Sequence, residues 1–324
     1  MGMSGPATPI SAVICTRRRP AQAVRALRSL CAQVPAVAEI LVIDNDPADA
    51  TLQQTVARDL PQVRYVCEPK MGLNVARNRA LREARMPLVA FLDDDAVADA
   101  GWAAVLAARL ASRPQLAVCT GRVEALELAT EAQRLFEANG GFSRGSETIR
   151  LPEDAVRRLH GWRAPLIAWA VSVGNGANVA IRHDVLTSLG GFDEALDGVM
   201  FPGGGDLDAF WRVLQSGYEL QYEPAALVYH EHRRELSAMA DQLAIHQKGV
   251  VAFLCKALSK APARAKAPVL SFLVWRLMKP GVRLARRAAM RDPLPAWILW
   301  RMAAAAYGGL WSYMLHGREQ TAAS

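Results

Sequence analysis

The amino-acid sequence predicts an α/β fold, with a mostly parallel sheet flanked by helices and a helical tail at the C-terminal end. In residues 1–120, short runs of β-branched residues alternate with amphipathic segments of helical length. This alternation is typical of parallel strands joined by crossover helices. Apolar residues make up 52% of the 324 residues, enough to bury one large core, so a disordered or fibrous protein is excluded.

The first half of the sheet is expected to contain four strands, each followed by a helix. The strands are predicted at residues 10–15, 39–44, 63–67 and 88–92. The helices are predicted at residues 20–32, 51–59, 73–84 and 102–113. Pro20 suits the first turn of a helix, where its missing N–H would have no partner. Residues 8–122 are therefore expected to form a nucleotide-binding half.

The second half, residues 123–258, is less regular in sequence. A strand is expected at residues 117–123, after which residues 124–170 lose clear periodicity and are expected to form a variable insertion. Order is expected to return at residues 171–182. The glycines 203–205 precede a helical stretch to Ser216, followed by a strand at 219–222 and a long helix at 235–258 with one apolar stripe. We expect the first domain to comprise residues 1–258.

Polar residues follow the predicted strands of the first half at the point where each strand ends. In an open α/β sheet, ligands bind beyond the carboxyl ends of the strands, so these side chains are expected to meet in one crevice. They are Thr16, Arg17, Arg18, Asp44, Lys70, Asn74, Asp93, Asp94 and Asp95. A single aspartate after a strand is more often a turn or helix-capping residue, and it is the coincidence of several that favours a site.

Asp93, Asp94 and Asp95 come directly after the apolar run 88–92 and concentrate negative charge at one strand end. Mg²⁺ and Mn²⁺ prefer carboxylate oxygen ligands, so the run suits a divalent cation that also contacts a phosphate. The alternative is a solvated acidic turn that caps the next helix, a role that Asp99 would also fill.

An ordered set of motifs runs along the chain. The motifs are C-T-R-R-R-P (15–20), L-V-I-D-N-D (41–46), G-L-N-V-A-R-N-R-A (72–80), F-L-D-D-D (91–95), G-N-G-A-N-V-A-I-R (174–182), G-G-F-D-E (190–194), G-G-D-L-D-A-F-W-R-V-L (204–214) and V-Y-H-E-H-R-R (228–234). Together these motifs resemble the family 2 glycosyltransferases. The resemblance covers residues 10–258. It implies the GT-A fold, whose sheet is Rossmann-like, with residues 8–122 binding a nucleotide-sugar and residues 123–258 facing the acceptor.

The resemblance also implies roles for the residues at the strand ends. Thr16 and Arg18 would line the base and ribose of the donor, and Asp44 would contact the base. Asp93 would face the ribose or a uridine-like group, and Asp95 would hold Mn²⁺ or Mg²⁺. Arg77 would lie near the diphosphate, and the nucleotide-sugar site is completed by Lys70, Asn74 and Asp94.

The family's catalytic base is an aspartate at the start of a helix, which corresponds to Asp206. An inverting transfer needs one carboxylate to accept the acceptor proton as the acceptor oxygen attacks. Gly205 stands where many members have glutamate, so Asp208 is kept as the fallback base. The alternative is that Asp206 only caps the helix that follows.

His230 and His232 follow an apolar strand and alternate with Glu231, so both imidazoles are expected on one side of the chain. The family often uses a histidine here to complete metal coordination or to contact the diphosphate. We predict His230 as the metal ligand and keep His232 as the fallback. The alternative is that both histidines are structural.

The activity implied is an inverting, metal-dependent transfer of a hexosyl or deoxyhexosyl group to a hydroxyl of a saccharide or lipid-linked saccharide, in cell-surface polysaccharide or glycolipid synthesis. A sugar nucleotidyltransferase is one alternative, but it would need a glycine-rich phosphate loop after the first strand, and C-T-R-R-R-P has no glycine. A non-catalytic nucleotide-binding scaffold is another, and the intact acids argue against it. A nucleic-acid partner is not expected.

Residues 259–324 are expected to form a basic, apolar helical tail that lies on a membrane surface. From Arg233 onward the chain has 15 Lys and Arg against 4 Asp and Glu, whereas the preceding part has 23 against 27. Arg283, Arg286, Arg287 and Arg291 would share one helix face beside the apolar runs 267–277 and 296–315. The alternatives are a tail packed on the domain and a segment 296–315 that spans the membrane.

The expected location is cytoplasmic, on the inner face of the cell membrane. Residues 1–9 lack the basic and apolar regions of a secretory signal. The five cysteines have no metal-ligand spacing and are expected to be reduced.

Overall fold

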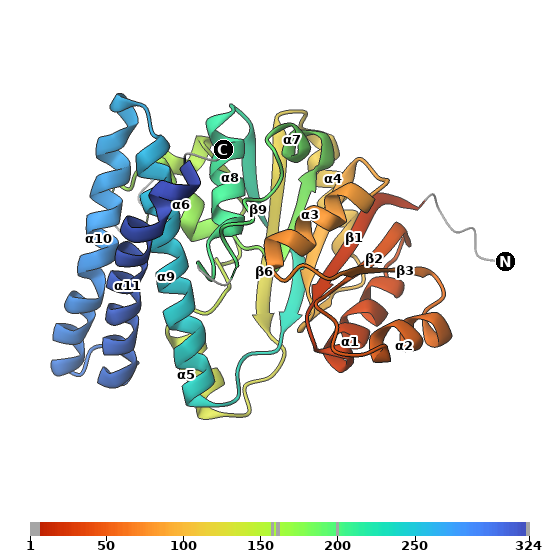
Figure 1. Ribbon diagram of the computed structural model, residues 1–324, viewed down its shortest axis with the longest axis horizontal. Helices are drawn as coiled ribbons and strands as arrows, with labels where there is room; N and C mark the ends of the chain where they lie inside the picture. The colour runs from red at the N-terminus through yellow and green to blue at the C-terminus, as the bar shows by residue number, and fades with distance from the viewer. Residues whose placement is uncertain (1–6, 157–158, 160–162, 199–200, 322–324) are drawn as a thin grey trace.

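The structure of the protein is a computed structural model that describes residues 7–156, 159, 163–198 and 201–321, with the side chains of 316–321 outside the description. The sheet runs through the middle of the molecule, with β1–β3 at one end and helices α10 and α11 at the opposite end (Figure 1). The residues 1–6 of the expected signal-free start, and residues 157–158 and 160–162 of the expected insertion, lie outside the described residues.

The described strands form one nine-stranded sheet in the order β3-β2-β1-β4-β8-β6-β9-β5, with β7 paired to β9. The strands are β1 (Thr8–Thr16), β2 (Val37–Asn45), β3 (Val63–Glu68), β4 (Leu88–Asp93), β5 (Ala96–Ala98), β6 (Leu116–Ala125), β7 (Ile149–Leu151), β8 (Asn178–Arg182) and β9 (Glu219–His230). The first four strands pair in parallel, as do β6 and β9, whereas β8, β5 and β7 pair antiparallel to their neighbours. The α/β class is confirmed, although the described sheet is more mixed than expected.

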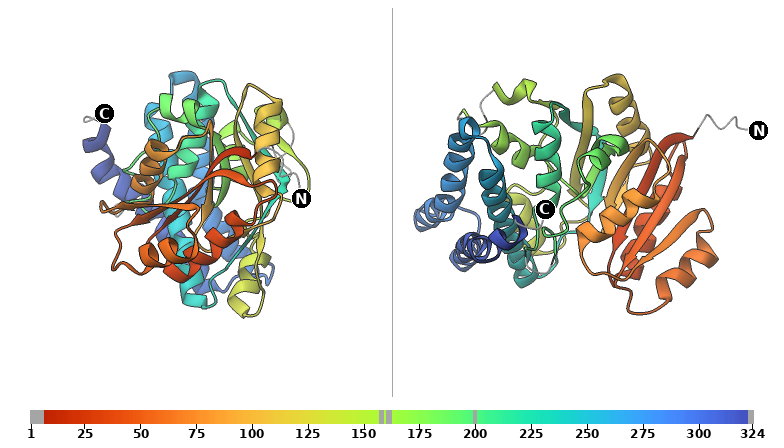
Figure 2. Two further views of the ribbon diagram at one scale, coloured as in Figure 1. Left: turned by 90° about the vertical axis from the view of Figure 1, so that its right-hand side faces the viewer. Right: turned by 45° about the horizontal axis from the view of Figure 1, so that its top comes forward.

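Helices cover both faces of the sheet (Figure 2). They are α1 (Pro20–Cys31), α2 (Thr51–Asp59), α3 (Leu73–Glu83), α4 (Trp102–Ser112), α5 (Glu131–Ala138), α6 (Leu166–Val173), α7 (His183–Ser188), α8 (Gly205–Gln215), α9 (Leu236–Lys260), α10 (Ala263–Ala288) and α11 (Ala296–Thr321), with a 3₁₀ turn η1 (Glu153–Val156). The four helices predicted for the first half lie within one residue of their expected bounds.

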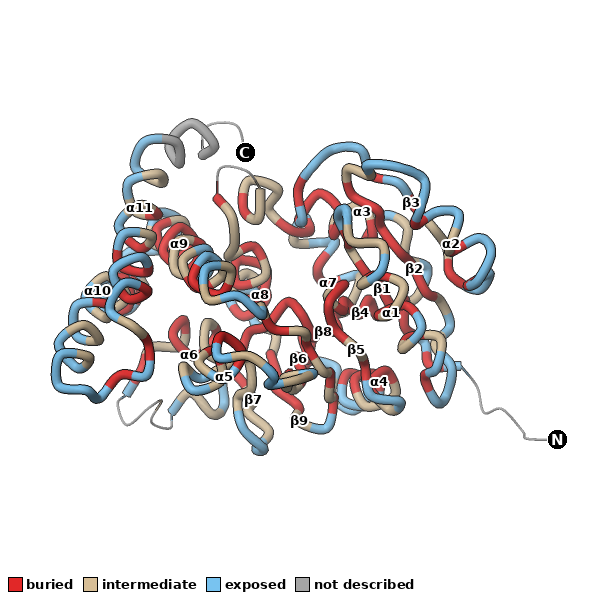
Figure 3. The backbone as a smooth tube through the Cα atoms, turned by 90° about the horizontal axis from the view of Figure 1, so that it is seen from below, coloured by how far each residue is buried: buried red, intermediate tan, exposed pale blue. Residues whose placement is uncertain are grey.

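The central strands are buried on both faces, as Figure 3 shows by their red colour. In β1, Ile10, Ala12 and Ile14 join one core cluster that includes α1 and α4. Val13, which points to the opposite face, joins a second cluster that includes α3 and α8. Burial on both faces explains why these strands are nearly continuous apolar runs in the sequence.

The insertion at 124–170 is more ordered than its sequence suggested. It contains α5, β7 and η1, and α5 begins with a capping box in which Thr130 and Gln133 bond each other's backbone N–H. Val171 lies inside α6 and does not begin a strand, so order returns as a helix followed by β8. The sequence of α6, L-I-A-W-A-V-S-V, is apolar on every side, and it therefore carries no helical period to detect.

Strand β9 also extends well beyond the expected residues 219–222. It passes Pro224 and continues to His230. The register between β6 and β9 shifts between Gly121 and Arg122, where Glu223 and Leu227 are the successive partners. This bulge accommodates the proline, whose ring nitrogen has no proton to donate to the ladder.

The tail is part of the fold. Helices α10 and α11 both pack against α9, which itself runs past the expected boundary at Leu258 to Lys260. Val269 and Phe272 of α10 belong to the main core cluster. Ile298 of α11 belongs to a further cluster shared with α9 and α5. The break in composition after Ser259 is therefore not a break in packing.

The prediction that four arginines of the tail share one helix face is wrong for Arg291. Helix α10 ends at Ala288, and Arg291 lies in the turn that follows. Arg283 donates two hydrogen bonds to the Asp292 carboxylate, at 2.8 and 2.7 Å, and Arg287 donates to the Asp292 carbonyl at 3.1 Å. Two arginines of the expected face thus hold the turn between α10 and α11. Among the described helices, none combines the length and hydrophobicity needed to cross a bilayer.

We predict that Ile298→Ala lowers the free energy of unfolding of the whole chain by about 2–5 kcal/mol, because Ile298 is fully buried between α11 and α9. Urea unfolding followed by circular dichroism measures this. Trp300→Ala, at a side chain 65% exposed on the same helix, is the control and should change stability by about 0.5 kcal/mol or less. An unchanged unfolding midpoint for Ile298→Ala would mean that the tail folds independently.

Candidate active site

Strand pairing brings the predicted acids and a distant histidine to one edge of the sheet. In parallel register, Cys15 of β1 lies beside Asp93 of β4, so Thr16 and the aspartates 93–95 follow neighbouring strand ends. The short strand β5 begins directly after Asp95 and pairs antiparallel with β9, so that Ala96 lies opposite His230. Residues 135 positions apart in the sequence, Asp95 and His230, are thereby placed side by side.

Asp93, Asp95 and His230 form the cluster that suits a metal ion. One ligand atom from each lies within 4.8 Å of the others. His230 Nε2 is 3.0 Å from Asp95 Oδ1 and 3.9 Å from Asp93 Oδ2. Two carboxylates are ligands that Mg²⁺ and Mn²⁺ favour, and the imidazole supplies a nitrogen. The donor set therefore fits a divalent cation, and it includes Asp93, which the resemblance to family 2 glycosyltransferases placed at the ribose or a uridine-like group.

Burial and mutual repulsion perturb these groups. Burial raises the pKa of Asp93 to about 6, and the Asp95 charge adds to the rise. Burial also raises the pKa of Asp95, but the hydrogen bond and charge of His230, with Arg233 and Arg19, outweigh it and lower the pKa to about 2. Burial lowers the pKa of His230, yet the hydrogen bond and charge of Asp95 raise it above its ordinary value. Opposite shifts in adjacent groups are typical of functional sites.

Two arginines compensate the acidic cluster from the solvent side. Arg19 Nη1 lies 3.3 Å from carboxylate oxygens of both Asp94 and Asp95, and Arg233 Nη1 lies 3.6 Å from Asp95. Thr16 donates a 2.7 Å hydrogen bond to Asp94 Oδ2. Asp94 is thus tied to the end of β1 and is not one of the three grouped ligands Asp93, Asp95 and His230.

Asp206 lies in the first turn of α8 and is held by the backbone. Its Oδ2 accepts the Gly176 N–H at 2.9 Å, and its Oδ1 accepts the Leu207 N–H at 2.8 Å. The helix cap is Gly204, in the left-handed conformation and without a side-chain cap bond, so Asp206 is not the cap residue. A Cβ on Gly176 would meet the Asp206 carboxylate at 2.8 Å, so glycine is needed there for this approach.

The packing around position 205 explains why a glycine stands there. A Cβ at this position would lie 2.0 Å from Asn74 Nδ2 and 2.4 Å from Asp197 Oδ2. Asp197 Oδ2 accepts the Gly205 N–H at 3.0 Å and lies 3.2 Å from Arg77 Nη1. The space that a larger side chain would need is therefore occupied by Asn74 and Asp197.

Asp208, the fallback base, is committed to ion pairs. It is buried, and its carboxylate lies 2.6 Å from Lys256 Nζ and 2.8 Å from Arg212 Nε. Asp206, in contrast, is partly exposed to two cavities. The geometry thus separates a buried structural aspartate from an accessible one.

Two cavities meet at Asp206. The first cavity, of about 610 Å³, is lined by Thr16, Arg77, the three aspartates 93–95 and His230. The second cavity, of about 630 Å³, lies among α6, α8, α9 and α10 and includes Trp169, Gln247 and Arg276. Both are lined by Phe142, Asn175, Gly203, Gly204, Asp206 and His246.

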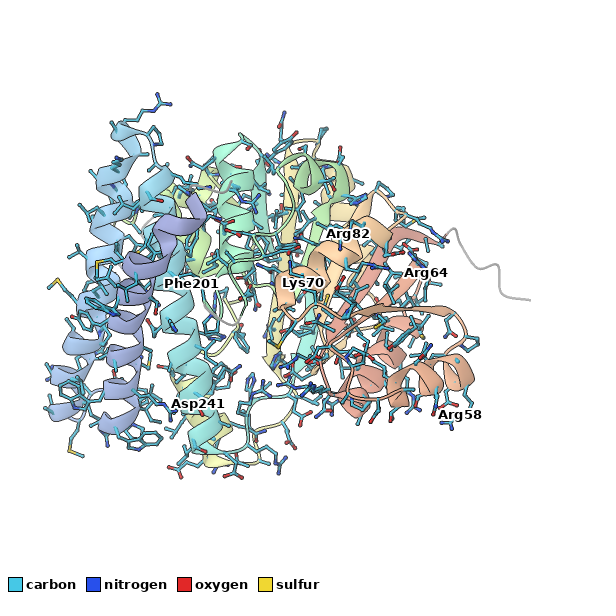
Figure 4. The ribbon with its side chains drawn as sticks, in the orientation of Figure 1. Arg58, Arg64, Lys70, Arg82, Phe201 and Asp241 are labelled. Carbon is cyan, nitrogen blue, oxygen red and sulfur yellow. The ribbon has the colours of Figure 1, made fainter. Side chains whose placement is uncertain are left out.

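Four predicted residues lie outside the lining of the first cavity. Arg18 turns to Asp46, and Asp44 accepts a 2.8 Å hydrogen bond from the Tyr65 hydroxyl. Lys70, labelled in Figure 4, pairs with Glu194 at 2.6 Å. Asn74 is fully buried and donates to backbone carbonyls that follow α7. The contacts expected between these four side chains and the nucleotide-sugar remain predictions.

His232, the fallback metal ligand, lies beside His230, with ring centroids 5.6 Å apart, but it pairs with a different acid. Its Nε2 lies 2.6 Å from Glu137 of α5, and its ring packs on Phe136 and Phe142. Glu231, between the two histidines, pairs with Arg25. His232 therefore anchors the insertion to the end of β9.

The structure adds residues that the sequence argument missed. They are Arg19, Asn175, Asp197, Arg233 and His246. Arg19 and Arg233 stand inside the quoted motifs C-T-R-R-R-P and V-Y-H-E-H-R-R, which gave a signal for them. His246 lies within a long helix and its sequence position carries no such signal.

The chain is similar in sequence to known glycosyltransferases. Residues 11–157 match the family model of glycosyl transferase family 2. A pre-mycofactocin glycosyltransferase of Mycobacterium tuberculosis is 28% identical over 221 residues, which are 68% of this chain and 42% of that relative. The chain thus spans less than half the length of that relative. The succinoglycan biosynthesis protein ExoM of Rhizobium meliloti is 26% identical over 240 residues, 70% of this chain and 69% of ExoM.

The fold is shared with a solved structure, the mannosyltransferase PcManGT from Pyrobaculum calidifontis in complex with GDP-Man and Mn²⁺. The superposition has a TM-score of 0.62 at 16% identity and covers 95% of this chain and 88% of the other. Because the superposition covers 95% of this chain, it includes most of the tail. With the family model and the relatives, it confirms the expectation from the motifs: residues 11–157 resemble glycosyltransferase family 2, and the chain has the GT-A fold.

Proposed function

We propose that the protein transfers a sugar from a nucleotide-sugar in the first cavity to a hydroxyl of an acceptor in the second cavity, with inversion at the anomeric carbon. The observation that carries the proposal is that the two cavities meet at Asp206, which among the described residues is the one acidic side chain that lines both. A donor and an acceptor held on opposite sides of Asp206 would bring their reacting atoms together.

The donor side is supported by the acid cluster and by the shared fold. Asp95 and His230, with Asp93, would hold Mn²⁺ or Mg²⁺, and PcManGT binds GDP-Man with Mn²⁺ on the same fold. A bound cation would offset the charge of the departing diphosphate. Arg77 is buried in the wall of this cavity, and Arg19 and Arg233 lie at its rim, so further positive charge faces the same place.

Asp206 acts as the base. As the acceptor oxygen bonds to the anomeric carbon, its proton passes to the Asp206 carboxylate, and the bond from that carbon to the phosphate oxygen breaks with its electrons leaving on the diphosphate. The two backbone N–H bonds orient the carboxylate without neutralising it. Attack from the face opposite the leaving group inverts the configuration, and no covalent intermediate on the enzyme is needed.

The acceptor is a saccharide or lipid-linked saccharide of cell-surface polysaccharide or glycolipid synthesis. The similarity to ExoM, named for succinoglycan biosynthesis, supports this class. The tail supports a membrane surface as a partner. Exposed apolar residues recur every four positions on α10, at Leu270, Val274, Met278 and Val282. A second exposed set on α11 comprises Trp297, Trp300, Tyr307 and Trp311.

These two sets lie on α10 and α11, at the left-hand end of the molecule in Figure 1, and expose apolar side chains on the basic tail. Interfacial membrane binding combines buried apolar area with attraction of basic residues to anionic lipid. We therefore propose that the protein is peripheral on the cytoplasmic face of the cell membrane, with α10 and α11 on the lipid.

We predict that Asp95→Ala removes the Mn²⁺-dependent part of nucleoside diphosphate binding, because the cluster loses one of its carboxylate ligands. Calorimetric titration of the full chain with GDP and with UDP, each with and without Mn²⁺, measures this. Asp59→Ala, an exposed aspartate on α2, is the matched control. Equal Mn²⁺-dependent binding by Asp95→Ala and the wild type would refute the metal assignment.

We predict that Asp206→Asn cuts turnover by about 10² to 10⁴ and leaves donor affinity near the wild-type value, since a positioned base contributes about that much to rate. Nucleoside diphosphate release from a panel of sugar nucleotides reports turnover. Asp208→Asn is the companion variant, and it should mainly lower stability because Lys256 loses a buried partner. The assignment is contradicted if Asp208→Asn abolishes turnover in a folded protein and Asp206→Asn is mild.

We predict that the double variant Trp300→Ser/Trp311→Ser floats with anionic phosphatidylserine vesicles several-fold less than the wild type, since it removes apolar area from the lipid-facing set. Wild-type binding should weaken as salt is raised. Val34→Ser/Val156→Ser, at exposed apolar residues outside the tail, is the control and should float normally. A wild-type protein that never floats would defeat the membrane proposal.

A further inference from the structure

The wall of the second cavity has an unusual charge. Its described lining includes four cationic side chains, Arg144, Arg276, Lys279 and Arg283, and one acidic side chain, Asp206. Three of the four cations come from α10, the first helix of the tail. The cavity is thus positive on the side away from the reacting carboxylate.

Three of these cations lack a carboxylate partner among the described residues. Arg283 is neutralised by Asp292. Arg276 Nη2 donates to the neutral amide oxygen of Gln247 at 2.7 Å, and its buried Nε has no partner in the described part of the chain. Arg144 donates only to backbone carbonyls, including those of Ser172 and Gly141.

Lys279 lies near two like charges, Arg276 and Arg283, and near one opposite charge, Asp292, which is already paired with Arg283. Burial lowers its pKa to about 8, and the charges of Arg276 and Arg283 add to the fall. Burial also lowers the pKa of Arg276 to about 10. Unpaired cations in a low-dielectric wall are costly to the fold, and a bound anion would offset that cost.

We propose that the second cavity binds an anionic group of the acceptor, a phosphate or a carboxylate, through Arg276 and Lys279. The inference rests on the proposed function, in which this cavity holds the acceptor. An ammonium and a guanidinium on one wall supply the charge-assisted donors that such oxygens accept. Asp206, at the other side of the same cavity, is then left to face the acceptor hydroxyl.

The proposal gives the tail a direct part in acceptor recognition. Phe272 and Leu273 of α10 fix this helix in the core, and Arg276 and Lys279, about one and two turns later, line the cavity. The same helix presents Val274 and Met278 outward. One element thus joins the proposed lipid surface to the anion site.

The test titrates the full chain with glucose 6-phosphate and with glucose, in EDTA so that no divalent cation binds the phosphate. We expect Lys279→Gln to weaken glucose 6-phosphate binding about tenfold, the effect of losing one charge-assisted hydrogen bond. Lys279→Arg should retain binding because it keeps the charge. Lys260→Gln, the same charge change at an exposed residue that ends α9, should bind like the wild type.

A second arm distinguishes a soluble from a lipid-borne anion. It measures binding to phosphatidylcholine vesicles with and without phosphatidic acid. A Lys279→Gln defect confined to phosphatidic acid vesicles would place the anion on a lipid headgroup, and a defect with glucose 6-phosphate would place it on a soluble acceptor. Equal affinities of Lys279→Gln and the wild type for both probes would overturn the inference.

The failure of this inference is distinguishable from failure of the proposed function. Mn²⁺-dependent GDP or UDP binding reports the first cavity, and Lys279→Gln should leave it unchanged. If the wild type shows no such binding, the proposed function fails. If nucleotide binding is intact and the phosphate affinity of Lys279→Gln is normal, only the anion site is refuted.

Discussion

The structure depends on how three adjacent carboxylates are accommodated at the end of β4. Asp93, Asp94 and Asp95 would repel one another at this spacing, and a shared set of partners offsets the repulsion. His230 lies beside Asp93 and Asp95, Arg19 beside Asp94 and Asp95, and Arg233 beside Asp95, whereas Thr16 donates to Asp94. These partners come from β1, β9 and the segments beside them. The pairing of β5 with β9 therefore matters for the site, because it places His230 next to Asp95.

Much of the fold was predictable because its signals are local. The strands of the first half are continuous apolar runs, the helices between them are amphipathic, and the aspartates follow the run 88–92 directly. Helix α6 and strand β9 were missed or shortened for opposite reasons. The first has no period because it is apolar on all sides, and the second contains a proline that only a bulge in its partner register accommodates.

Site residues that lie within a sequence motif were predictable, whereas those whose role depends on tertiary contacts were not. Asp95, Asp206 and His230 line one cavity, as the resemblance implied, although their roles remain predictions. Sequence alone did not separate Asp206 from Asp208, because the distinction rests on Lys256, which lies 48 residues later. It also could not show that Asn74 and Asp197 fill the space beside Gly205. The prediction for the tail rested on its composition. Composition shows that the tail is basic, but it does not show which tail residues are buried against α9.

We infer that the acids at the end of β4 and His230 hold the cation that serves the nucleotide-sugar donor. Anomalous diffraction at the manganese absorption edge, from crystals of the full chain grown with Mn²⁺ and a nucleoside diphosphate, tests it most directly. We expect one strong peak within coordination distance, about 2.0–2.3 Å, of Asp95 and His230, with the diphosphate beside it in the first cavity. A nucleotide bound in that cavity with no manganese peak there, or with the peak on other side chains, would contradict it.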